Sequence, residues 1–216
     1  MAAVTFLAEG FLTLLYPPAC AVCDASFVGR GVLRAGFCDR CRSAMTLPRE
    51  MAPAAAVSAM EAGFAVAAVG QYDDPLRTAI HLLKYSRRDD LARPLAALMG
   101  DLMTRLERER EGNWKRPRLL VPVPLHPARE RQRGYNQARL LAGRISARFG
   151  IPLAPGRALR RRRRTGSQTR RGAGCRREMM REAFRAGWRT GLSGKSVLLV
   201  DDVITTGATL AACAAT

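Results

Sequence analysis

Two adjacent carboxylates mark the position where the chain offers its clearest chemistry. Asp201 and Asp202 directly follow the apolar run Val197–Val200, so they lie at the end of a predicted strand. A short loop then leads into a predicted helix, and its small and hydroxyl-bearing residues let the backbone approach an anion closely. The sequence therefore indicates an anion cradle beside an acidic pair that binds either a diol or a metal ion. The cradle consists of Thr205, Thr206, Gly207, Ala208 and Thr209.

Four cysteines near the N-terminus have the spacing of a metal site. Cys20 and Cys23 form one pair, and Cys38 and Cys41 form a second pair after an intervening glycine-rich segment. Two such pairs close a tetrahedron of thiolates around zinc, so we predict a structural Zn²⁺ site that folds a segment too short for a core of its own. Two disulfides and an iron–sulfur cluster are the alternatives, and disulfides are disfavoured in a chain without a secretion signal.

These two sites predict a chain in two parts. Residues 1–45 form an N-terminal helix and a four-cysteine zinc ribbon, and residues 64–216 form the main domain. Residues 46–63 are rich in Ala, Pro and Met, which is typical of a linker. We therefore expect the ribbon and the main sheet to fold separately.

Strands and helices alternate in the main domain. This alternation predicts an α/β fold, with a parallel sheet covered by helices on both faces and Val197–Val200 as a fully buried strand. The carboxyl ends of parallel strands meet at one edge, so the loop after residues 118–124 should lie beside the loop at residues 201–209. The predicted strands are 64–69, 118–124 and 197–200, and the predicted helices are 75–85, 90–110 and 134–150.

The charge of the chain is unusual. Lys and Arg total 36 against 18 Asp and Glu, which gives a net charge of +18 over 216 residues. Such a surface attracts polyanions, so phosphates, nucleic acid and anionic lipid are all candidate partners. Arginine is concentrated between Arg157 and Arg189, but no aromatic residue interleaves with Arg160–Arg164. Stacking on the bases of single-stranded DNA is therefore weakly supported in this run.

The first apolar stretch, residues 1–18, does not have the features of a membrane anchor. It lacks a basic start, carries Glu9, and is shorter than the ~20 apolar residues that cross a bilayer. We expect a short amphipathic helix that stops at Pro17, no membrane span, and a cytoplasmic protein.

Two motifs resemble those of known families. The run VLLVDDVITTGAT at residues 197–209 looks like the phosphoribosyl pyrophosphate motif of type I phosphoribosyltransferases. The run VPVPLHPARERQRGYNQA at residues 121–138 resembles the ComF family of competence-associated proteins, which join a cysteine ribbon to a phosphoribosyltransferase-like domain. Tyr72, Lys84 and the four-cysteine ribbon also match that family in position. The resemblance covers almost the whole chain.

The resemblance implies a site and a reaction. Asp201 and Asp202 would face the ribose hydroxyls of phosphoribosyl pyrophosphate, and Thr205–Thr209 would hold its 5-phosphate. With Mg²⁺, the domain would move the phosphoribosyl group to or from a nitrogen acceptor. The alternative implied by the family is an accessory protein of DNA uptake that binds single-stranded DNA or a partner such as a competence helicase.

Arg129 and Arg133 flank a loop that should face the acidic pair. Bidentate guanidinium contacts suit pyrophosphate, although each arginine alone is also compatible with a solvated surface position. His126 is either a general acid or a residue with a structural hydrogen bond, and we favour the structural role.

The chain departs from the ComF pattern in two places. In the stretch that forms a mobile flap in type I enzymes, Arg171 replaces a leucine and Met179 replaces an asparagine. The second departure is that the chain stops at Thr216, whereas the family continues with further strands and helices. We therefore expect the C-terminal strands to be missing from the sheet, which leaves an unpaired strand edge.

Overall fold

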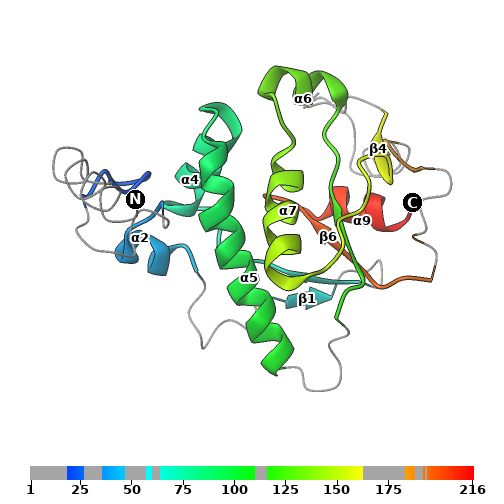
Figure 1. The fold of residues 1–216 in the computed structure, drawn as a ribbon, viewed down its shortest axis with the longest axis horizontal. Helices are drawn as coiled ribbons and strands as arrows, with labels where there is room; N and C mark the ends of the chain where they lie inside the picture. The colour runs from blue at the N-terminus through cyan, green and yellow to red at the C-terminus, as the bar shows by residue number, and fades with distance from the viewer. Residues whose placement is uncertain are drawn as a thin grey trace, which may run out of the picture.

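The computed structural model describes residues 19–26, 36–46, 57–59, 64–109, 116–162, 183–187, 192 and 194–216. It consists of helices and short strands, as Figure 1 shows. The helices are α2 (Asp39–Ala44), α4 (Leu76–Tyr85), α5 (Ala92–Glu109), α6 (Pro127–Arg133), α7 (Gln137–Phe149) and α9 (Ala208–Ala214), with the 3-10 turn η2 (Asp89–Leu91) before α5. The strands are β1 (Val57–Ala59), β2 (Ala65–Ala67), β3 (Leu119–Pro122), β4 (Leu159–Arg161), β5 (Phe184–Ala186) and β6 (Val197–Val200).

A small parallel sheet lies at the centre of the main domain. Strands β3 and β6 pair in parallel, from Leu119 opposite Val197 to Pro122 opposite Val200. The pairing continues one residue further, because the N–H of Val123 donates to the carbonyl of Val200 at 2.9 Å. The loops that follow β3 and β6 therefore leave the same edge, which confirms the α/β prediction and the neighbourhood of the two loops. The further assignment to the phosphoribosyltransferase type stays a prediction.

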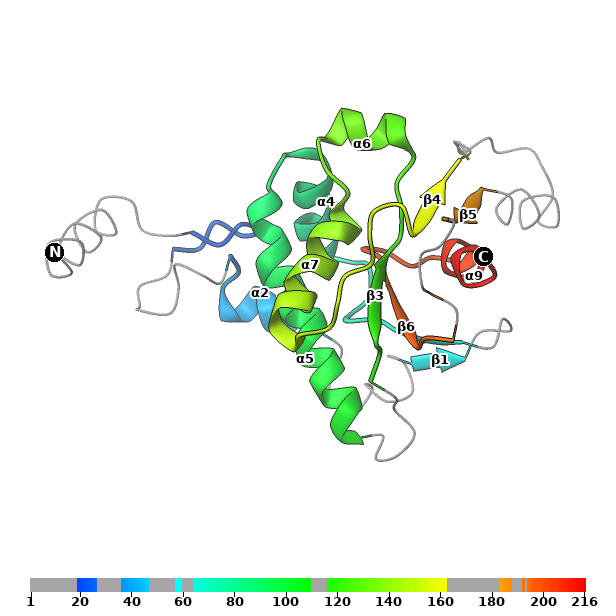
Figure 2. The same ribbon diagram turned by 45° about the vertical axis from the view of Figure 1, so that its right-hand side comes forward.

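Helices α5 and α7 pack against each other beside this sheet (Figures 1 and 2). The leucine stripe predicted for residues 90–110 is largely buried, and it includes Leu95 and Leu98. The two helices come close at Gly100, where a Cβ atom would lie only 2.7 Å from the Arg148 side chain. Helix α7 ends at Gly150 in the left-handed conformation that glycine adopts readily, as predicted.

The loop predicted after β3 contains a helix that sequence reasoning missed. His126 caps the first turn of α6, Pro127 occupies its first position, and Gly134 ends it with a φ of 89°. Proline at the start and glycine just past the end are the usual signals of a short helix, and both were present in the sequence.

The cysteine-bearing segment shares one hydrophobic core with the main domain. Phe37 and Met45 are almost fully buried, and they belong to the same cluster as Leu76 and Leu91. The contact is close at Gly70, where a Cβ atom would lie 2.2 Å from the carbonyl oxygen of Met45. This shared core differs from the expectation that the ribbon folds separately.

A charged contact joins the same two parts, and a strand lies within the predicted linker. Asp101 on α5 pairs with Arg42 on α2 at 2.9 Å and with Arg148 on α7 at 2.8 Å. Strand β1 falls within residues 46–63 and pairs antiparallel with β2. The boundaries of the proposed domains remain a prediction.

The expectation that β6 is fully buried is wrong for the described residues. Helices do lie on both faces of the sheet, since Leu120 packs in one core cluster with residues of α7 and Leu119 packs in a second cluster with residues of α9. Val200 is buried, but Leu198 and Leu199 are half-buried and Val197 is 42% exposed. A cavity of about 810 Å³ borders β6, and apolar side chains from β2, α4, α5 and α7 complete its wall. The strand therefore has an apolar face that the described residues cover only in part.

Within the described residues, no helix combines the length and the apolar character needed to cross a lipid bilayer.

Candidate functional site

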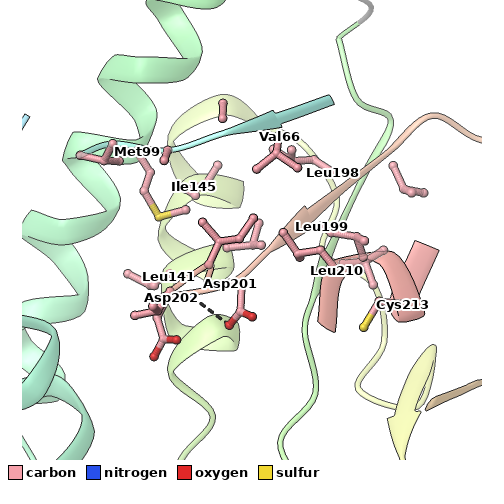
Figure 3. A pocket seen from close by; sticks show the side chains of 18 of the residues that line it. Val66, Met99, Leu141, Ile145, Leu198, Leu199, Asp201, Asp202, Leu210 and Cys213 are labelled. Atoms are coloured by element: carbon pink, nitrogen blue, oxygen red, sulfur yellow. Dashed lines mark hydrogen bonds between the residues drawn. The ribbon is translucent and has the colours of Figure 1, made fainter. Parts of the chain in front are cut away.

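The acidic pair lies where the sequence predicts it, at the carboxyl end of β6. The apolar residues of β6 form the strand, and Asp201 and Asp202 follow at its end, where they line one end of the cavity (Figure 3). The backbone N–H of Asp202 donates to the Asp201 side chain at 2.9 Å. The strand and this hydrogen bond fix the pair locally.

The predicted anion cradle follows as a loop that enters α9. Thr205 and Thr206 are exposed, and Gly207 precedes α9 with a φ of 71°, a conformation that favours glycine. Ala208 and Thr209 belong to the first turn of α9 and are half-buried. The loop therefore presents hydroxyl groups beside the acidic pair.

Helix α4 supplies a cation to the acidic pair. The Lys84 ammonium nitrogen lies 3.0 Å from a carboxylate oxygen of Asp202, and the two side chains are only 15% and 6% exposed. In the sequence, Lys84 stood out only as part of the ComF resemblance. No local pattern identifies this partner, because the contact joins segments that are far apart in the chain.

The two carboxyl groups of the pair have different surroundings. Burial, together with the negative charge of Asp202, raises the pKa of Asp201 to about 7 from the ordinary value of 3.8. Lys84 opposes this rise. Near neutral pH, the charged and protonated forms of Asp201 are therefore both populated.

Arg161 on β4 is a charged neighbour that sequence reasoning assigned only to the arginine-rich run. Burial lowers its pKa, and the positive charge of Arg129 adds to this effect, whereas Cys213 and Asp201 act in the opposite direction. Arg161 thus lies within electrostatic reach of both Arg129 and Asp201. The signal in the sequence was alternation, which places Arg161 on the same face of β4 as buried Leu159.

The two arginines proposed as pyrophosphate contacts lie on α6. Arg129 is exposed, and its positive charge contributes to the lowered pKa of Arg161. Arg133 donates to the side chain of Gln137, and its guanidinium carbon lies 5.3 Å from the centre of the Tyr85 ring. Arg133 is therefore engaged by protein groups, and contact with a ligand remains a prediction for both arginines.

His126 and Asn136 act as helix caps. The Nδ1 atom of His126 accepts from the N–H of Ala128 at 3.2 Å, which agrees with the structural role favoured for this residue. Asn136 is buried, donates to the carbonyl of Val123 at 3.0 Å and caps α7. These caps connect the loop after β3 to the two helices that follow it.

The four cysteines meet as the spacing predicts. The sulfur atoms of Cys20, Cys23, Cys38 and Cys41 all lie within 4.8 Å of one another, and no disulfide joins them. The Cys23 and Cys38 sulfurs are 3.7 Å apart, close to the ~3.8 Å edge of a tetrahedron with zinc–sulfur bonds of ~2.3 Å.

The cysteines of this cluster differ in their thiol pKa values. Burial raises the pKa of Cys20, but N–H groups of Cys38, Val22 and Cys23 outweigh it and lower the pKa to about 6. Burial and the neighbouring cysteines raise the pKa of Cys41. Without a bound cation, Cys20 therefore loses its proton more readily than Cys41 does.

Part of the sequence prediction falls outside the described residues. The N-terminal helix expected before Pro17 lies there, and so do most of the flap and the arginine-rich run, including residues 163–182.

The chain is similar to named bacterial proteins. Over 143 residues it is 36% identical to the DNA utilization protein YhgH of Escherichia coli strain K12 and 35% identical to the Competence protein F of Haemophilus influenzae. The match covers 66% of this chain and 61% of the length of each relative. No family model matches the chain, and no solved structure matches it.

Proposed function

We propose that the chain is a ComF-type protein that binds phosphoribosyl pyrophosphate at the end of β6 and transfers its phosphoribosyl group to or from a nitrogen acceptor. The observation that carries this proposal is the placement of Asp201 and Asp202 at the carboxyl end of a parallel strand, beside a loop of hydroxyl groups. Ligands of open α/β sheets bind at this edge. The relatives named for competence and DNA utilization support the family assignment.

The chemistry at this site is electrostatic. A carboxylate beside the ribose stabilises positive charge that develops on the sugar as the bond to pyrophosphate breaks. Asp202 fits this role because Lys84 holds it in place. Asp201 can take up or release a proton near neutral pH, since its pKa is about 7. Arg161 lies near Asp201 and Arg129 lies near Arg161, so both add positive charge that would offset the negative charge of the leaving pyrophosphate.

The donor groups near the acidic pair do not form a magnesium site by themselves. The described residues bring no third carboxylate or histidine to Asp201 and Asp202, and the ammonium group of Lys84 is already paired with Asp202. Mg²⁺ in such enzymes is held largely by substrate phosphates, where it neutralises charge on the leaving group. We therefore assign no step of the reaction to a protein-bound magnesium ion.

The four-cysteine cluster fits a structural zinc ion. Four sulfur ligands leave no open position for catalysis, so the metal would act on folding alone. Because the cluster shares its core with α4 and α5, its metal would also stabilise the main domain.

Titration calorimetry with phosphoribosyl pyrophosphate and Mg²⁺ tests ligand binding. Asp202→Asn removes a charged hydrogen bond to the ribose, so we expect a loss of ~1.5–3 kcal/mol in binding free energy. Asp73→Asn is the control, since Asp73 is an exposed acidic residue before α4. Equal affinities of the wild type and Asp202→Asn would refute the assignment of the site.

A second candidate function is binding of single-stranded DNA in DNA uptake, with or without a helicase partner. The charge of +18 and the names of the relatives favour it. Binding through phosphates predicts that log K falls with log[salt] at ~0.7 per phosphate neutralised. Changing Arg160, Arg162 and Arg164 to Ala should flatten this slope. An unchanged slope would exclude that run as the DNA contact.

A further inference from the structure

The last turn of α4 is clamped by the segment that joins α6 to α7. The Tyr135 hydroxyl donates to the backbone carbonyl of Leu83, and the Arg133 guanidinium lies over the ring of Tyr85. Leu83 and Tyr85 flank Lys84 in the chain, so both contacts act on the turn that carries this lysine. Residues 133–137 therefore hold in place the backbone from which the Lys84 side chain extends.

The Lys84 side chain then crosses to the end of β6. The two partners of the Lys84–Asp202 pair are largely shielded from water, which strengthens their attraction and raises the cost of losing either one. Asp202 lines the cavity, whereas the described residues of α4 present Leu76, Ile80 and Leu83 to it. The ammonium group thus supports the carboxylate from the side of α4.

We propose that Lys84 is a positioning residue of the acidic pair, which keeps Asp202 directed into the cavity, and that residues 133–137 hold α4 in the place this contact requires. The proposal rests on the proposed phosphoribosyl site and assigns Lys84 and Tyr135 a role in it. In this role Lys84 acts on the ligand through Asp202 and makes no ligand contact of its own.

Two other titratable groups lie near Asp201. Arg161 approaches Asp201 from β4, and Cys213 lies near it on α9.

The experiment compares Lys84→Met and Lys84→Arg with the wild type by calorimetry with phosphoribosyl pyrophosphate. Loss of the cation leaves a buried carboxylate without its partner, so Lys84→Met should weaken binding about ten- to a hundredfold. Lys84→Arg restores the charge and should recover most of the affinity. Lys195→Met is the matched control, since Lys195 is exposed and precedes β6, at the end of the strand opposite Asp202.

A double-mutant cycle separates support of Asp202 from direct ligand contact. In an Asp202→Asn background, Lys84→Met should cost less than about threefold, because the partner that needs the lysine is gone. An equal loss in both backgrounds would overturn the proposal. Tyr135→Phe should weaken binding a few-fold in the wild type and add little to Lys84→Met, whereas fully additive losses would refute the role of residues 133–137.

A second measurement does not depend on ligand. Lys84 lowers the pKa of Asp201, so the Asp201 carboxyl carbon, followed by NMR of the aspartate-labelled protein, should titrate at higher pH in Lys84→Met than in Lys84→Arg or the wild type. An unchanged Asp201 titration in folded Lys84→Met protein would overturn the proposal. If the wild type does not bind phosphoribosyl pyrophosphate, the proposed function fails, and the NMR titration still decides the role of Lys84.

Discussion

Replacing Asp201 with Asn should stabilise the protein at alkaline pH while weakening ligand binding. The pKa of Asp201 is raised to about 7 from 3.8 because the side chain is buried and lies beside Asp202. The folded protein therefore holds this proton more tightly than the unfolded chain does. Asn resembles the protonated side chain, so the variant keeps the favourable state at every pH.

The size of the effect follows from the shift. A rise of about three pH units corresponds to at most ~4 kcal/mol, because one unit is worth ~1.4 kcal/mol. Asp201 keeps some contact with water, so we expect ~2–4 kcal/mol. The stability that the proton contributes is fully present below about pH 4 and is lost as the pH rises to about 7. The difference between variant and wild type should thus grow across this range and stay constant above it.

Urea unfolding followed by circular dichroism at about pH 4, 5.5 and 8 measures this difference. Asp73→Asn serves as the control, because an exposed carboxyl group should give a difference close to zero at each pH. If Asp201→Asn changes the free energy of unfolding equally at all three values, the raised pKa and the reasoning behind it are wrong. Calorimetry on the same samples should show weaker binding of phosphoribosyl pyrophosphate to the more stable variant.

Three further predictions concern stability. Cys38→Ser, or removal of zinc by a chelator, should lower the melting temperature of the whole chain in calorimetry, since the cysteine segment shares its core with α4 and α5; a separate low-temperature transition would contradict this. Asn136→Ala should cost ~1–3 kcal/mol in urea unfolding, because it leaves the buried carbonyl of Val123 without its donor, and His126→Ala should cost less because its cap is only half-buried. Gly207→Ala should destabilise the protein by ~1 kcal/mol or more, because Gly207 has a positive φ. Its control, Gly143→Ala, should stabilise the protein by up to ~1 kcal/mol, because Gly143 is helical and has open space for a Cβ atom.

The sequence alone predicted the local parts of the site. An apolar run specifies a strand, so the acidic pair after it had to lie at a strand end, and β6 places it there. Cysteine spacing likewise predicted the four-sulfur cluster, because each pair needs only a tight turn. Proline and glycine at the ends of α6 are also a local signal of a helix.

Contacts between distant segments depended on the tertiary structure. Lys84 reaches Asp202 because α4 packs beside β6, and nothing near either residue in the sequence specifies that approach. The same holds for Met45, which is buried against the main domain although the intervening segment has the composition of a linker. Exposure of Val197 also escaped prediction, since an apolar run indicates a strand but not which elements cover its faces. Periodicity and spacing determine local conformation and ligand geometry, whereas the charge state of the acidic pair depends on burial and on the cations that the fold brings to it.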